Sequence, residues 1–255
     1  MSSILYGPVP SWRLGRSLGV DLVAADEKTC SFDCIYCQLG RTVHRCIERK
    51  EFVTLNQLKH ELLSLSDLEA DYATLCGVGE PTLASNIVEA IEILRQTLTL
   101  PVALITNSSL LSREDVRRDL VTIDVVLAKL DAHNEEAFQM VNRPVTDCSF
   151  EMIINGIRLF REIYKGKLAL QIMFVRQNMY YARQIADLAR SLSPDEVQLN
   201  TPLRPCAEAP LSPDEMDGIS VEFHGLNVIE VYHSLRPNVL PLNTVETARR
   251  RPMAP

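Results

Sequence analysis

The stretch Cys30-Ser31-Phe32-Asp33-Cys34-Ile35-Tyr36-Cys37 decides how the rest of the chain is interpreted. It spaces three cysteines as Cys-x3-Cys-x2-Cys and follows a first candidate strand at residues 17–22. We therefore expect a loop at the carboxyl edge of a sheet, where parallel α/β folds build their sites. Three soft thiolate ligands on one short loop can surround a compact metal centre.

The number of cysteines in this loop limits the kind of centre. Structural zinc takes four protein ligands, and a fully ligated iron–sulfur cubane also takes four cysteines. Three cysteines leave one metal position open, as catalytic metal sites do. Two other interpretations stay open at this point: a zinc site completed by His44 or Cys46, and reduced thiols without a metal. The remaining cysteines form no Cys-x2-Cys pair: Cys46, Cys76, Cys148 and Cys206.

Outside the cysteine loop, short apolar runs alternate with amphipathic helical patterns. We expect strands at residues 17–22, 72–76, 102–106, 125–130, 168–175 and 197–200. Helices are expected from Thr54 and at residues 86–98, 112–120, 135–141, 150–164, 180–192 and 213–223. Thr54 is expected to cap the first of these helices, and Ser112 with Asp115 to cap the third. The alternation predicts one parallel sheet with right-handed crossovers, and it leaves an open sheet and a barrel as alternatives.

Composition excludes several classes of protein. The 255 residues are 46% hydrophobic and 23% charged, which is typical of a soluble globular protein. We expect no signal peptide and no membrane-spanning helix, because neither a basic, apolar leader nor a run of about 18 apolar residues is present. The net charge of −7 disfavours nonspecific nucleic-acid binding. The odd number of cysteines argues against a disulfide framework, so we expect a cytoplasmic protein.

The last 20 residues differ in composition from the rest. They contain four prolines and the triplet Arg249-Arg250-Arg251. We therefore divide the chain into a core domain at residues 1–235 and a Pro/Arg-rich C-terminal tail at residues 236–255. The tail is expected to be extended and solvated.

The cysteine loop resembles the signature of the radical S-adenosylmethionine (SAM) superfamily, in which an aromatic residue, here Tyr36, precedes the third cysteine. The resemblance implies that Cys30, Cys34 and Cys37 hold a [4Fe–4S] cluster whose fourth iron binds SAM. It also implies reductive cleavage of SAM to a 5′-deoxyadenosyl radical that abstracts hydrogen from a substrate. The fold implied is a partial (β/α)6 TIM-type barrel with parallel strands, which agrees with the six strand–helix units.

The same resemblance implies SAM contacts elsewhere. The segment Cys76-Gly77-Val78-Gly79-Glu80 is similar to the superfamily's glycine-rich motif, which binds the methionine amino group, so Gly77, Gly79 and Glu80 are expected there. Without the resemblance this segment would be an ordinary strand-to-helix turn. In the superfamily, residues near the ends of later strands contact the ribose, the methionine carboxylate or each other. The resemblance assigns these positions to Asn107, Lys129, Asp131 and Gln171. Tyr36 completes the expected cofactor-binding set.

Further segments resemble small radical enzymes grouped with the tRNA wybutosine-synthesis proteins. They include Tyr6-Gly7-Pro8-Val9-Pro10-Ser11 and Asn142-Arg143-Pro144, and Trp12 and Ser108 depart from that pattern. The true wybutosine enzymes carry a second cluster on cysteines that precede the radical motif. Because no cysteine precedes Cys30 here, one cluster is expected and the wybutosine reaction is not.

The leading hypothesis is a radical SAM enzyme with one [4Fe–4S] cluster and SAM as cofactors. The substrate class stays open among a small molecule, a tRNA and a protein, and no catalytic residue is assigned. The partner expected is an external electron donor such as a flavodoxin or ferredoxin. Substrate contacts are expected at the barrel mouth from Arg13, Arg16, Arg41, Arg143 and residues 200–204. The alternatives are an iron–sulfur electron-transfer protein with Cys46 as fourth ligand, and a zinc-binding interaction module.

Overall fold

The computed structural model describes residues 3–66, 68–145 and 147–252. The strands are β1 (Leu5–Ser11), β2 (Gly15–Val20), β3 (Thr29–Cys30), β4 (His44–Arg45), β5 (Tyr72–Leu75), β6 (Val102–Thr106), β7 (Val125–Lys129), β8 (Lys167–Met173), β9 (Glu196–Asn200) and β10 (Val228–Glu230). The α-helices are α1 (Leu55–Leu63), α2 (Ile87–Thr97), α3 (Glu114–Leu120), α4 (Glu135–Val141), α5 (Phe150–Ile163), α6 (Ala182–Ser191), α7 (Pro213–Val221) and α8 (Thr244–Arg250). Two short 3₁₀ helices are η1 (Pro81–Leu83) and η2 (Met179–Tyr181).

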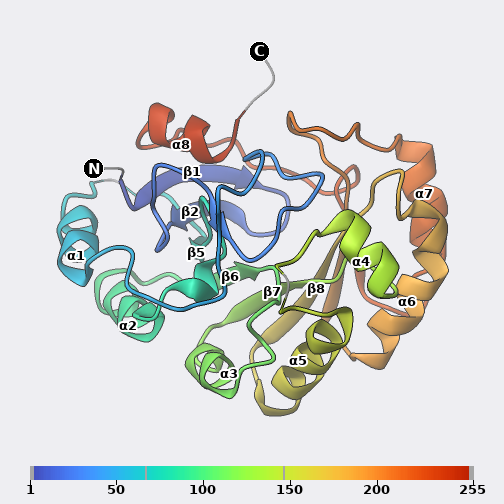
Figure 1. Ribbon diagram of the computed structural model, residues 1–255. Coiled ribbons are helices and arrows are strands. Elements are labelled where there is room, and N and C mark those ends of the chain that lie inside the picture. The colour runs from blue at the N-terminus through green and yellow to red at the C-terminus, as the bar shows by residue number, and fades with distance from the viewer. Residues whose placement is uncertain (1–2, 67, 146, 253–255) are drawn as a thin grey trace.

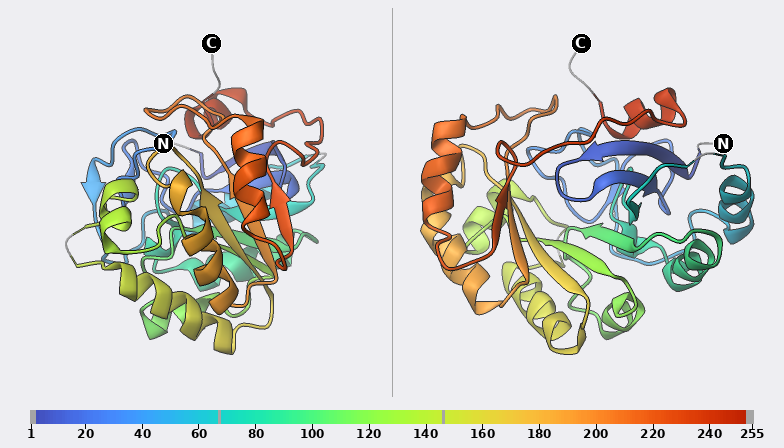
Figure 2. Two further views of the ribbon diagram at one scale, coloured as in Figure 1. Left: turned by 90° about the vertical axis from the view of Figure 1, so that its right-hand side faces the viewer. Right: turned by 180° about the vertical axis from the view of Figure 1, so that it is seen from behind.

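One curled sheet organises the molecule. Its strand order is β1-β2-β5-β6-β7-β8-β9-β10, and every neighbouring pair is parallel except the β1–β2 hairpin. The sheet bends into a half-barrel with helices α1 to α7 along its outer side (Figures 1 and 2). The expected partial barrel is therefore confirmed, and the choice that strand spacing left open is decided in favour of the barrel. Strands β3 and β4 form a separate two-stranded ladder beside it.

Successive side chains of a strand point to opposite faces of the sheet. One set packs into the outer core beneath the helices, and the other set lines the inside of the half-barrel, which we call the lumen. On β6, Leu104 packs into the large core beneath the helices, whereas its neighbour Ala103 belongs to a second apolar cluster. That second cluster also contains Leu127, Ala169 and Leu14, the last of which lies in the turn between β1 and β2. Leu14 therefore covers one end of the lumen.

The expected strands and helices are all present, with shifts of a few residues at their ends. Thr54 caps α1 as expected, because its side chain accepts a hydrogen bond from the backbone N–H of Gln57. The expectation for Ser112 is wrong: α3 begins at Glu114, and its cap residue Arg113 makes no side-chain cap bond. Strands β1, β3, β4 and β10 and helix α8 were not expected from the sequence.

Up to residue 252, the C-terminal segment is not the extended, solvated tail that its composition predicts. Residues 253–255 of the predicted tail lie outside the described residues. After β10 the chain crosses to the opposite edge of the sheet, where α8 lies beside β1 (Figure 2, right). The backbone N–H of Leu242 donates to Gly7 O at 2.6 Å, and the Gly7 N–H donates to Thr247 Oγ1 at 2.9 Å. Arg250 is buried and pairs with Asp21 at 2.8 Å. Composition could not reveal this pairing, because the ions lie 229 positions apart.

Among the described residues, no helix combines the length and the apolar character needed to cross a membrane.

Candidate active site

The cysteine loop follows β3 and is held by backbone contacts on both sides. The N–H of Asp33 donates to the carbonyl of Asn142, and that of Ile35 donates to the carbonyl of Val141, at 3.1 and 3.0 Å. The Asp33 carboxylate in turn accepts from the Thr42 N–H at 2.7 Å and pairs with Arg45. The loop is therefore fixed to the end of α4 and to its own return segment, which gives its three thiols defined positions.

The three thiols of the cysteine loop lie on one short, tightly turned segment. The N–H of Cys37 donates to Cys34 O at 3.1 Å, and the N–H of Cys46 donates to Cys30 O at 3.2 Å. Three thiolates on one short segment suit a multi-metal cluster with one open position.

Two side-chain amides lie against the cysteine sulfurs. Asn107 Nδ2 lies 3.5 Å from Cys30 Sγ, and Asn142 Nδ2 lies 3.6 Å from Cys34 Sγ. Hydrogen bonds to sulfur are one way in which a protein adjusts the reduction potential of an iron–sulfur cluster. Asn107 was singled out from the sequence as a SAM contact, whereas Asn142 was quoted in a motif without a role. The Asn142-Arg143-Pro144 motif was the available signal.

Burial controls the protonation of the cysteine loop. It raises the pKa of Cys30 to about 12 and that of Cys34 to about 11, so both thiols are neutral until a metal displaces their protons. The buried ammonium of Lys28 donates to Gly40 O at 3.0 Å. Burial by itself lowers the pKa of Lys28, but Cys37 and Cys30 nearby outweigh it and the pKa is raised. Lys28 was not singled out from the sequence, although it lies two positions before Cys30.

The glycine turn is joined directly to the cysteine loop. Thr29, the residue before Cys30, donates its N–H to Val78 O, and its carbonyl accepts from the Glu80 N–H, both at 3.3 Å. A β-carbon on Gly79 would lie 1.9 Å from Thr29 O, and one on Gly77 would lie 2.0 Å from the Asp21 carboxyl carbon. Glycine is needed at Gly79 because the backbone before Cys30 approaches so closely, and at Gly77 because the buried Asp21 carboxylate does.

Glu80 is occupied by internal hydrogen bonds. Its carboxylate is buried and accepts from the N–H and hydroxyl of Thr82, from the hydroxyl of Thr106 and from the N–H of Asn107. Three of these bonds end on Oε1 and the bond from Asn107 ends on Oε2. The side chain therefore holds the glycine turn against the end of β6, and its direct contact with a methionine ammonium stays a prediction.

A polar network lines the ends of β7 and β8. Lys129 Nζ lies 3.0 Å from Gln171 Oε1 and 3.4 Å from an Asp131 oxygen, and it sits 4.9 Å from the centre of the Tyr36 ring. The Tyr36 hydroxyl donates to Asp131, which also accepts from Asn142 at 2.8 Å. Four of the residues singled out from the sequence therefore meet here. Burial, and then the Asp131 charge, raise the pKa of Tyr36, so the phenol stays protonated and remains a donor.

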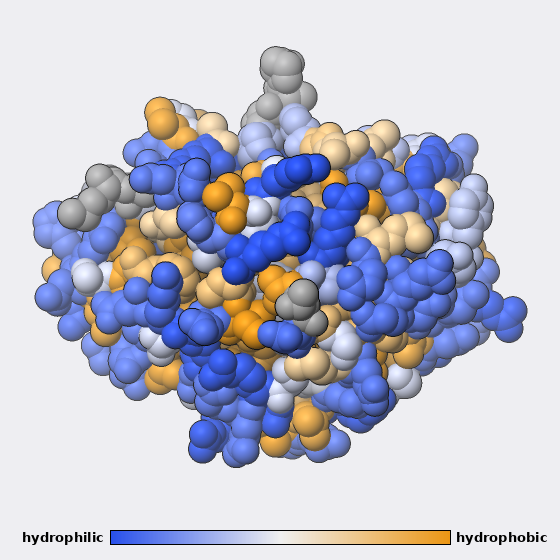
Figure 3. All heavy atoms as spheres, viewed as in Figure 1, coloured by the Kyte–Doolittle hydropathy of each residue, from blue (hydrophilic) through white to orange (hydrophobic). Residues whose placement is uncertain are grey.

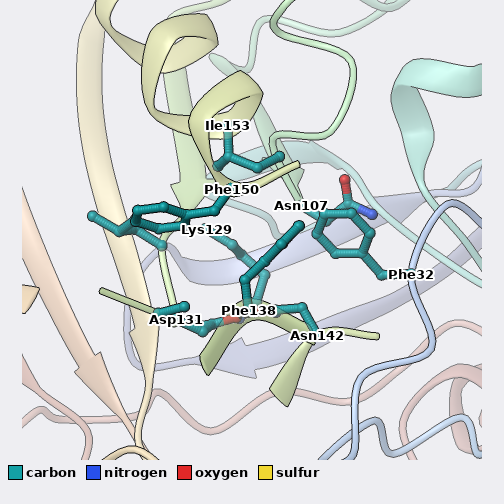
Figure 4. A pocket seen from close by; sticks show the side chains of 10 residues that line it. Phe32, Asn107, Lys129, Asp131, Phe138, Asn142, Phe150 and Ile153 are labelled. Carbon is teal, nitrogen blue, oxygen red and sulfur yellow. Dashed lines mark hydrogen bonds and ion pairs between the residues drawn. The ribbon is translucent and has the colours of Figure 1, made fainter. Parts of the chain in front are cut away.

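A small cavity lies beside this network (Figure 4). Phe32, Phe138 and Phe150 line it together with Lys129 and Asp131, and its volume is about 10 Å³. That space holds about one water molecule and cannot admit a nucleoside. A cofactor of that size therefore has to lie outside this cavity. On the face shown in Figure 1, hydrophilic side chains gather across the middle, over the loops that follow β2 (Figure 3).

The two alternative ligands have other partners. His44 is exposed and pairs with Glu27 at 3.0 Å, and Cys46 Sγ donates to Glu48 O at 3.2 Å. Within the part of the chain that the structure describes, neither belongs to a tight group of three ligand atoms with the cysteines. Neither side chain is therefore arranged to complete a zinc tetrahedron.

Replacing Gly79 with alanine is expected to separate the glycine turn from the cysteine loop. The obstacle is the backbone carbonyl of Thr29, which cannot rotate away, so we expect a loss of about 1–3 kcal/mol of unfolding free energy and weaker SAM binding. Urea unfolding and a SAM titration would measure these. The control is Gly218→Ala on α7, where nothing lies within 4 Å and helix propensity predicts a gain of about 0.5–1 kcal/mol. Wild-type stability and SAM affinity in Gly79→Ala would contradict the prediction.

Comparison with known proteins agrees with this arrangement. The profile of the radical SAM superfamily matches residues 28–189. A UPF0026 protein of Methanocaldococcus jannaschii is 39% identical over 225 residues, covering 86% of this chain and 69% of that protein. A UPF0026 protein of Synechocystis is 38% identical and covers 79% of this chain and 76% of that protein. The finer grouping with wybutosine-synthesis proteins stays a prediction.

Solved structures show the same fold. The crystal structure of Streptococcus suis SuiB bound to SAM superposes with a TM-score of 0.64 at 12% identity, covering 86% of this chain. The chain spans about half of SuiB, 51% of its length. The half-barrel, the joined cysteine and glycine segments, the superfamily match and the two close relatives lead to one conclusion: this chain belongs to the radical SAM superfamily of enzymes and, within it, to the UPF0026 proteins.

Proposed function

We propose that this chain binds one [4Fe–4S] cluster through Cys30, Cys34 and Cys37 and cleaves SAM reductively at that cluster. The observation that carries the proposal is the pairing of Thr29 with the glycine turn, which brings the predicted SAM-binding segment against the predicted cluster loop. The two amides beside the cysteine sulfurs fit a cluster of this kind.

When bound, the cluster supplies one electron to the sulfonium of SAM, which yields methionine and a 5′-deoxyadenosyl radical that abstracts hydrogen from the substrate. The chain's own residues hold the cysteine sulfurs and the glycine turn in position. Asn107 and Asn142 support the cysteine sulfurs, and Glu80 holds the glycine turn at the end of β6.

The polar network at the ends of β7 and β8 is the proposed site for the methionine part of SAM. An ammonium has three donors, and Lys129 directs two of them to Gln171 and Asp131, so a third is left for a carboxylate. Tyr36 and Asn142 hold Asp131 in place from the other side. Only 13% of the Lys129 side chain is exposed, which strengthens a pairing with a bound carboxylate.

An electron-transfer protein without SAM chemistry is supported less well. It needs a fourth cysteine ligand, and the Cys46 thiol donates to Glu48 O instead. It also needs no glycine turn beside the cluster loop. A SAM enzyme does need an external one-electron donor, and we propose a flavodoxin or ferredoxin in that role. SuiB was solved with a precursor peptide, so a peptide joins small molecules and tRNA among the substrate classes to be tested.

The proposal predicts SAM cleavage by the reconstituted chain. The protein is loaded with iron and sulfide under anaerobic conditions, reduced with dithionite and mixed with SAM, and 5′-deoxyadenosine and methionine are quantified. We expect both products in equal amounts, and neither without reductant. A fully loaded cluster that yields no 5′-deoxyadenosine, alone or with added cell extract, would contradict the proposal and favour the electron-transfer protein.

A further inference from the structure

Arg204 and Arg13 each lie close enough to Arg251 and Arg236 to be affected by their charges. Arg13 lies in the β1–β2 turn, Arg204 follows β9, Arg236 follows β10, and Arg251 ends α8. Burial, followed by the charges of Arg251, Arg13 and Arg236, lowers the pKa of Arg204 to about 9. Burial and the charges of Arg251 and Arg236 lower the pKa of Arg13 to about 10. We call these four residues the arginine cluster.

The arginine cluster has no acidic partner. Among the described residues, none of its members forms an ion pair, whereas Arg16, Arg49 and Arg250 each pair with a carboxylate. The Nε atoms of Arg13 and Arg251 are buried and have no hydrogen-bond partner in the described part of the chain. Arg13, Arg204 and Arg251 are half-buried, and Arg236 is exposed. Leaving the two buried Nε donors without acceptors is costly, so this arrangement calls for an anion.

The arginine cluster lies next to the proposed active site. The Arg13 guanidinium lies 5.0 Å from the centre of the Trp12 ring. Gln38 Nε2 donates to Arg250 O at 2.9 Å, which places the backbone beside Arg251 next to Gln38. Arg204 donates to Gln38 Oε1 at 3.2 Å, and Gln38 directly follows Cys37. Burial raises the pKa of the Cys76 thiol, and the nearby charges of Arg251 and Arg13 counteract that effect. Cys76 directly precedes the glycine turn. The cluster is therefore positioned to hold one end of a substrate whose other end reaches the radical.

We propose that the arginine cluster binds a terminal phosphate or diphosphate group of a small-molecule substrate. The proposal deepens the proposed function and rests on it, since it assigns a substrate class to the same site. Guanidinium groups bind phosphate oxygens bidentately, and a group of arginines without an ion pair among the described residues suits an anion with two or more negative charges. A nucleic-acid backbone offers one charge per phosphate, and the net charge of −7 opposes its approach.

Calorimetric titration of the full reconstituted chain with pyrophosphate tests this proposal. At constant ionic strength we expect saturable binding, tighter than that of citrate. Arg204→Gln is expected to weaken pyrophosphate binding about tenfold, because a charge-assisted contact is lost. The matched control is Arg183→Gln, the same change at an exposed position of α6, and it is expected to bind as the wild type does.

A second measurement uses the only tryptophan of the chain. Because Arg13 stacks on Trp12, pyrophosphate is expected to change the tryptophan fluorescence of the full chain with the same affinity, and inorganic phosphate to act more weakly. The proposal is overturned by absent pyrophosphate binding, by equal losses in Arg204→Gln and Arg183→Gln, by tighter binding of citrate, or by tighter binding of an RNA without terminal phosphates.

The two proposals fail separately. Pyrophosphate binding without any cleavage of SAM would contradict the proposed function and leave the anion site standing. Cleavage of SAM without pyrophosphate binding would overturn the anion site and leave the radical chemistry standing.

Discussion

Replacing Cys34 with alanine is expected to abolish the iron–sulfur cluster, taking the iron content of the reconstituted chain from about four atoms to near zero. Two remaining thiolates cannot hold a cubane, and the described residues offer no tight group of ligands with the cysteines to replace the third. Formation of 5′-deoxyadenosine should fall below detection with the iron. Iron and sulfide analysis, with the visible absorbance of the cluster, would measure the first effect.

The matched control is Cys206→Ala. Cys206 is partly buried like Cys34, but its thiol donates to Glu208 O at 3.2 Å. We expect this variant to keep its full iron content. Full iron occupancy in Cys34→Ala would reject the assignment of the cluster ligands, and a large loss in Cys206→Ala would show that a further cluster had been overlooked.

Replacing Arg250 with alanine is expected to cost about 3–5 kcal/mol of unfolding free energy, because it leaves the buried Asp21 carboxylate without its cation. Asp21 also accepts from the N–H of Val78 at 3.1 Å, so the same change reaches the glycine turn. The Arg250 guanidinium further covers the Tyr6 ring at 5.0 Å. We therefore expect weaker SAM binding along with the lower stability.

Urea unfolding of Arg250→Ala and the wild type would measure this difference. The control is Arg113→Ala, because Arg113 pairs with Asp115 on the surface, where both side chains are more than 40% exposed. Such a pair contributes less than about 1 kcal/mol. Equal losses in the two variants would show that the buried pair does not anchor α8.

Much of the fold could be predicted, because residues that are close together in the chain determine where strands and helices form. The short apolar runs at residues 102–106 and 125–130 became β6 and β7, because parallel strands that are buried on both faces have continuous apolar sequences. Strand β1 was missed because Pro8 and Pro10 weaken a strand pattern, and an edge strand tolerates them. Helix α8 was missed because prolines surround it and its burial depends on Asp21.

The sequence by itself determined the three cysteines of the predicted cluster loop, the strand–helix alternation and the glycine turn, since each is a pattern of residues close together in the chain. Tertiary structure alone decided that Asn142 meets Cys34, 108 positions away, and that Arg250 meets Asp21, 229 positions away. It also decided that four arginines without acidic partners among the described residues share one region. Spacing along a chain constrains local conformation, whereas contacts between distant segments depend on how the whole sheet curls.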